Sequence, residues 1–214
     1  MEIKQTLGMS GYQTHLFMAL AEAVKAFEST LAATTAGPPL NEATATPELT
    51  ILHYELEQRR AVVLMLASAT VEALANLYMR LRSTPEQALL LERATVVEKW
   101  TVVPSLFLPN YAFPTDGELY QDLKRLTDRR NALMHLKEDV MSDRAGTHKG
   151  KSPRYAGDEH AFVVRCGTLA RRLIEHVASF DKSGAAKDSQ MFIGFAEVMT
   201  GWCGPGRRVT EQSG

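Results

Sequence analysis

The sequence predicts an all-α protein, and three features lead to that prediction. Apolar residues recur at intervals of three and four along most of the 214 residues, whereas few segments alternate as strands do. Thr-Pro-Glu occurs at 46–48 and at 84–86, and a threonine cap followed by proline is a typical helix start. Hydrophobic residues make up 45% of the chain, which is enough to fill a sizeable core.

Turn and cap signals place the expected helices along the chain. Gly and Pro residues in 35–48 end the first helix, and three prolines between 102 and 117 break any long helix there. The middle of the second helix, 61–79, is apolar nearly all round, so we expect it at the centre of a bundle. The expected helices are 12–33, 47–81, 84–100, 118–137 or slightly beyond, 160–180 and a short one at 190–199.

We expect one domain over residues 1–200. Its core lies at about 47–182, with an extra N-terminal helix before Thr46 and a long basic loop after the fourth helix. The Gly-rich segment 201–214 is expected to be a flexible C-terminal tail.

Composition limits the classes of partner. With 24 basic and 25 acidic residues, the chain has a formal net charge of −1, so only a local patch would attract nucleic acid. Cys166 and Cys203 lack metal-ligand spacing and are too few for a disulfide framework, which fits a reducing cytosol. The chain shows no secretory pattern, and its uncharged runs are interrupted or too short to span a membrane. We therefore expect a cytoplasmic protein, without metal or cofactor.

The fourth helix carries an arginine in an apolar stripe. Leu119, Leu123, Leu126, Arg130 and Leu133 follow one another along that stripe. Burying an unpaired guanidinium costs several kcal/mol, so Arg130 needs a carboxylate, a phosphate-binding cleft or a subunit interface.

Asn131 and His135 lie four residues apart on one helix face, where an amide can orient an imidazole. His135 lies about 140° around the helix from Arg130. The two side chains would converge only if the helix is distorted or a second chain supplies half of the site. The Arg-to-His spacing alone occurs four times in the chain, so it decides nothing.

A structural interpretation stands beside the catalytic one. Arg130 could form a buried ion pair, with Glu72 as a candidate partner, and His135 could be a surface residue. Ser68, Glu72 and Asn76 form a polar row spaced by four on the apolar second helix. That row either positions Arg130 or forms a buried structural network.

The segment Arg-Asn-Ala-Leu-Met-His, 130–135, resembles the Arg-Asn-x-x-x-His motif of HEPN domains (higher eukaryotes and prokaryotes nucleotide-binding). The upstream segment 64–81 is similar to the first long core helices of that family, and the pattern extends over about 49–180. The resemblance implies an all-α bundle that pairs as a dimer with the motif at the interface. Many such domains are metal-independent ribonucleases of toxin–antitoxin, abortive-infection or CRISPR-associated systems; others are non-catalytic.

The resemblance implies Arg130 and His135 as catalytic residues, with Asn131 as the accompanying polar position. We expect Arg129 and Glu72 to be supporting residues. RNA would be cleaved through attack by its 2′-hydroxyl in a composite site of a homodimer, and a cognate antitoxin protein is an implied partner. The alternative is a non-catalytic HEPN-like module for dimerisation or for binding a protein or nucleotide.

The chemistry is consistent with those residue types. Cleavage without metal needs a base, an acid and a cation for the developing phosphorane charge. Histidine titrates near neutrality, and arginine holds a phosphate through two hydrogen bonds. One chain supplies one histidine at this position, whereas a two-fold pair supplies two. The basic loop either contacts the RNA backbone or is a solvated connection, and its cations are Arg144, Lys149, Lys151 and Arg154.

Overall fold

The computed structural model describes residues 2–38, 40–41, 43–134 and 159–205, with side chains from residue 13 onward. Over these residues the protein is helical, and the all-α prediction is confirmed. The elements are α1 (Glu2–Ala36), α2 (Pro47–Arg82), α3 (Pro85–Leu91), α4 (Val96–Thr101), the 3-10 helix η1 (Val103–Leu106), α5 (Glu118–Met134), α7 (Glu159–Ala178) and α8 (Ala185–Thr200).

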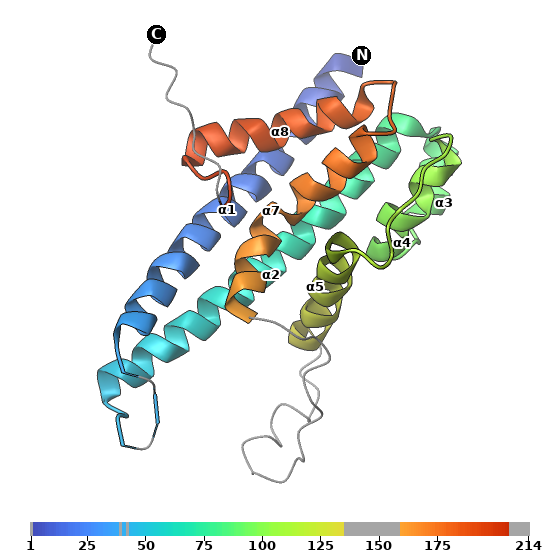
Figure 1. Cartoon of the computed structure of the whole chain (residues 1–214). Coiled ribbons are helices and arrows are strands. Elements are labelled where there is room, and N and C mark those ends of the chain that lie inside the picture. Colours follow the sequence, from blue (N-terminus) through green and yellow to red (C-terminus); the bar gives the residue numbers. More distant parts are fainter. Residues whose placement is uncertain (1, 39, 42, 135–158, 206–214) are drawn as a thin grey trace.

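The helices pack around α2 (Figure 1). The long helices α1 and α2 lie side by side, and α7 and α5 pack along α2. α8 crosses α1 and α7 near one end of the bundle, while the last turn of α5 lies at the other end. α3, α4 and η1 form a short helical layer beside the C-terminal half of α2.

The central place of α2 agrees with its sequence. Thr46 caps the helix by accepting a hydrogen bond from the Leu49 backbone N–H at 3.2 Å, and Pro47 occupies the first turn. Val63, Ala67 and Leu74 are fully buried on its inner face. By length and composition α2 could also cross a membrane, but 61% of its most apolar window is buried inside the bundle. A core helix has the same properties.

α1 and α8 are longer than expected and both belong to the core. α1 begins ten residues before the predicted start, and its inner face contributes Phe17, Leu20 and Phe27. α8 begins at Ala185 rather than at 190, because Asp181 accepts the Ala186 N–H at 3.0 Å and organises the turn before the helix. The hydrophobic core therefore extends beyond 47–182 on both sides.

The predicted single helix over 84–100 is wrong, because α3 and α4 are separate helices. Thr95 begins α4 with a capping box: its hydroxyl accepts the Glu98 N–H, and the Glu98 carboxylate accepts the Thr95 N–H at 2.7 Å. The new direction buries Trp100, whose indole N–H donates to the Val71 carbonyl at 3.2 Å.

The first residues after α8 pack against the bundle, in contrast to the flexible tail expected from residue 201. The Trp202 indole N–H donates to Glu28 on α1 at 3.3 Å, and Cys203 is buried. Gly167 on α7 makes room for this indole. A Cβ at Gly167 would lie 2.5 Å from Trp202 Cη2 and 2.8 Å from Val24 Cγ2.

We therefore expect Gly167→Ala to lower the free energy of unfolding by about 1–3 kcal/mol through overpacking. Urea denaturation followed by circular dichroism measures the loss. In the double variant with Trp202→Ala the loss should be smaller than the sum of the two single losses, since the indole is then absent. Simple additivity would show that the methyl group and the indole do not meet.

Candidate functional site

The candidate site lies at the C-terminal end of α5. Arg130 is half-buried there, and its Nη1 donates a hydrogen bond to Oδ1 of the exposed Asn131 at 3.1 Å. Leu133 and Met134 in the same turn are exposed to solvent. His135 follows directly in the sequence but lies outside the described residues. The structure thus places the Arg-Asn half of the motif at an open helix end.

The buried arginine of α5 is Arg125, so the prediction that Arg130 is the buried one is wrong. Arg125 is 5% exposed, and its guanidinium lies 4.1 Å from the ring centre of Phe162 on α7. Its Nη2 donates to Glu159 at the start of α7. The apolar stripe of α5 is covered at Leu123 and Leu126 but open in its last turn, which leaves Arg130 half-exposed.

Arg129 shares the carboxylate that holds Arg125. Its Nη2 donates to Glu159 Oε2 at 3.0 Å, across from α5 to α7. Glu159 therefore fixes the turn of α5 that precedes Arg130, and Arg129 has a structural role in the single chain.

A second part of the same α5–α7 seam is centred on Asp122. Its carboxylate accepts two hydrogen bonds from Arg165, at 3.1 and 3.2 Å, and one from Arg172 at 2.7 Å. Arg172 also donates to Glu118 at 3.0 Å. Sequence reasoning missed this cluster. The available signal was the seven-residue spacing of Arg165 and Arg172, which puts both on one face of α7.

Glu72 was the candidate partner of Arg130, but in the structure it pairs with Lys99. Its carboxylate lies 3.8 Å from the ammonium group of Lys99, a buried residue of α4. Ser68 in the same row is buried. Among the described residues the buried Oδ1 of Asn76 accepts no hydrogen bond, so the link that this row makes between α2 and α4 is the Glu72–Lys99 pair. The basic loop residues Arg144, Lys149, Lys151 and Arg154 lie outside the described residues, so their contact with RNA stays a prediction.

The two arginines beside Glu159 lower the pKa of its carboxyl group. Burial alone would raise its pKa, but the hydrogen bond from Arg125 and the charges of Arg129 and Arg125 outweigh burial and lower the pKa below its ordinary value of 4.5. A lowered folded-state pKa means that Glu159 contributes stability above its unfolded pKa. That contribution is lost as the pH falls through the folded value.

We expect Glu159→Gln to destabilise the protein at pH 7 and to remove part of its acid sensitivity. Urea unfolding between pH 7 and pH 3 measures the effect. The difference between the urea midpoints of wild type and variant should be constant near neutral pH and should shrink to near zero once the pH falls below the ordinary carboxyl range. Glu55→Gln, at an exposed carboxylate of α2, is the matched control. A gap that stays unchanged to pH 3 would contradict the ion-pair origin of the effect.

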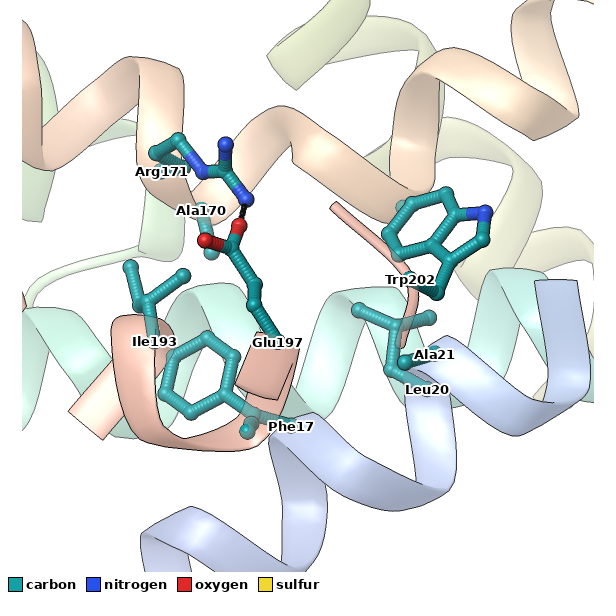
Figure 2. Close-up of a pocket in the computed structure, with 10 residues that line it drawn as sticks. Phe17, Leu20, Ala21, Ala170, Arg171, Ile193, Glu197 and Trp202 are labelled. Carbon is teal, nitrogen blue, oxygen red and sulfur yellow. Dashed lines mark ion pairs between the residues drawn. The ribbon is translucent and has the colours of Figure 1, made fainter. Parts of the chain in front are cut away.

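A small cavity lies between α1, α7 and α8 (Figure 2). Its volume of about 20 Å³ is room for a water molecule and not for a substrate. Arg171 and Glu197 form an ion pair at its edge, and Phe17, Leu20 and Trp202 line it. Among the described residues, no cluster of three or more His, Cys, Asp or Glu side chains could hold a metal ion.

The described residues form an all-α helical bundle, and an arginine–asparagine pair lies in the solvent-exposed last turn of α5. No family model, no curated protein and no solved structure matches the chain.

Proposed function

We propose that the protein is a metal-independent endoribonuclease of the HEPN type, with its site at the C-terminal end of α5. Arg130 binds the scissile phosphate, and His135 acts as general acid or base. The observation that carries the proposal is the hydrogen bond from Arg130 to Asn131 at a solvent-open helix end, four residues before His135.

The Arg130–Asn131 contact suits phosphate binding. A guanidinium has five N–H donors in one plane, so the bond to Asn131 leaves enough donors for two further bonds to a phosphate. The ion pairs of Glu159 hold the preceding helical turn, so that Arg130 projects from a rigid support.

A composite site of two chains completes the reaction. One histidine acts as base toward the 2′-hydroxyl and the other protonates the leaving 5′-oxygen. The exposed Leu133 and Met134 beside Arg130 support such pairing, because apolar side chains at a helix end favour a protein contact. We place this activity in the cytoplasm, as a toxin or antiviral effector that a cognate antitoxin protein restrains.

A second candidate function is a non-catalytic helical module. Arg125 and Arg129 both pair with Glu159, so part of the arginine-rich face of α5 serves the fold. In that case Arg130 would be an interface residue.

Incubating the purified protein with RNA in EDTA tests the proposal. We expect cleavage by the wild type and a loss of about 10²–10⁴-fold in His135→Ala, which lacks the proton-transfer group. His15→Ala, at an exposed histidine of α1, is the matched control and should cleave normally. The catalytic proposal fails if the wild type shows no cleavage beyond that of His135→Ala.

A further inference from the structure

One carboxylate serves two arginines at the seam between α5 and α7. Glu159 Oε2 accepts a hydrogen bond from Nη2 of Arg125 and another from Nη2 of Arg129, the latter at 3.0 Å. Two guanidinium charges against one carboxylate charge leave this cluster with an excess of one positive charge. The cluster is therefore a local cation and not a balanced ion pair.

The excess charge belongs to Arg129. Arg125 is buried against the ring of Phe162, so it depends on Glu159 to compensate its charge. The Arg129 side chain is 40% exposed, and among the described residues it donates one hydrogen bond, to Glu159. Of its two other nitrogens, Nε is buried. The Nη1 group of Arg129 is thus open to a ligand.

Arg129 and Arg130 follow each other in the exposed last turns of α5. Consecutive residues of a helix differ by about 100° around its axis and by about 1.5 Å along it. The two side chains therefore diverge from almost the same height of the helix. Their guanidinium groups reach adjacent sites, and they do not converge on one atom.

The acids of this region are directed away from the space between the two arginines. Asp128 lies about 100° from Arg129 and about 160° from Arg130 around α5. Glu159 is held by the buried Arg125, which keeps the carboxylate on the bundle side of Arg129. An anion that approaches from solvent meets the two cations first.

We propose that Arg129 binds the phosphate next to the scissile phosphate held by Arg130. This inference rests on the proposed ribonuclease and deepens it, because it names the substrate as an RNA strand with at least two consecutive phosphodiesters at the site. Arg129 then has Glu159 on its protein side and a phosphate on its solvent side. One guanidinium can serve both, since its donors lie along different edges of one plane.

The salt dependence of binding tests this contact. The probe is a single-stranded 2′-O-methyl RNA oligonucleotide, which lacks the attacking hydroxyl and stays intact, and fluorescence anisotropy measures its dissociation constant over a range of salt concentrations. We expect Arg129→Gln to raise the dissociation constant about tenfold at low salt. The slope of the logarithm of affinity against the logarithm of salt concentration should fall by about 0.7, the value for one phosphate contact of a single strand.

Lys124→Gln is the matched control. Lys124 is an exposed cation of the same helix, about 120–140° around the axis from both arginines. The dissociation constant and the slope should equal those of the wild type. An equal fall of the slope in Lys124→Gln would overturn the proposal, because the effect would then follow the total charge and not the site.

Two further variants separate phosphate binding from support of α5. Arg129→Lys keeps a point charge that contacts phosphate, so its slope should match the wild type. Glu159→Gln removes the ion pair but keeps the Arg129 guanidinium, and we expect it to bind the oligonucleotide at least as tightly as the wild type. If Glu159→Gln and Arg129→Gln weaken binding equally, Arg129 acts only by holding the helix and the proposal is wrong. Circular dichroism verifies that each variant is folded at the assay temperature.

These binding measurements require no cleavage. If the wild type binds the oligonucleotide but does not cleave RNA, the ribonuclease proposal fails, and the slope still reports whether Arg129 contacts a phosphate. If the wild type cleaves RNA and Arg129→Gln keeps the wild-type slope, the Arg129 contact is wrong and the ribonuclease proposal stands.

Discussion

Replacing Asp122 with alanine is expected to lower the free energy of unfolding by about 3 kcal/mol, because two partly buried arginines lose their buried carboxylate and keep only the exposed Glu118 as a partner. The Asp122 side chain is 5% exposed, and its carboxylate forms ion pairs with both Arg165 and Arg172. The arginine side chains are 34% and 27% exposed, so water reaches them in part and the loss should fall at the lower end for a buried ion pair.

Asp116→Ala is the matched control for Asp122→Ala. Asp116 lies just before α5 and is exposed, so its removal should change the free energy of unfolding by less than about 0.5 kcal/mol. Asp122→Asn keeps an acceptor oxygen without the charge and should lie between the two. Urea denaturation at pH 7 measures all three variants. If Asp122→Ala unfolds with the same midpoint as Asp116→Ala, the ion pairs of the α5–α7 seam do not stabilise the protein.

Replacing Arg130 with alanine is expected to reduce RNA cleavage by about 10²–10³-fold, the usual effect of losing one group that stabilises transition-state charge. The same change should shift the free energy of unfolding by less than about 0.5 kcal/mol, because the side chain is half-exposed at the end of a helix. The two readouts, initial cleavage rate and urea midpoint, separate a catalytic role from a structural one.

Arg93→Ala is the control for removal of a positive charge, because Arg93 is exposed in the turn between α3 and α4. It should leave both readouts unchanged. The opposite pattern for Arg130→Ala, a lowered midpoint with cleavage intact, would favour the non-catalytic module over the ribonuclease.

Helix starts and the central helix could be predicted because their determinants are local. Thr46 and Thr84 cap their helices by accepting N–H groups only three residues ahead. The apolar run of α2 likewise indicates by itself that the helix must be buried on most sides. The break before α4 has an equally local signal, the Thr95–Glu98 capping box, but the continuing apolar pattern of 84–100 obscured it.

The site was less predictable, because its geometry depends on which part of α5 other helices cover. The stripe pattern alone assigned the buried position to Arg130, whereas the structure buries Arg125 and leaves the last turn open. Glu72 likewise pairs with Lys99 on the short helix α4 rather than with an arginine of α5.

By itself the sequence determined the helical class, the capped start and central place of α2, and the position of Arg130 and Asn131 on α5. Only the tertiary structure decided which charges are paired and which apolar faces are left open. The seam bonds join residues 30 to 54 positions apart, and no periodicity within one helix encodes such a partner. The exposure of Met191, Phe195 and Val198 on α8 could not be predicted from the sequence either, because neighbouring helices decide whether an apolar side chain is covered.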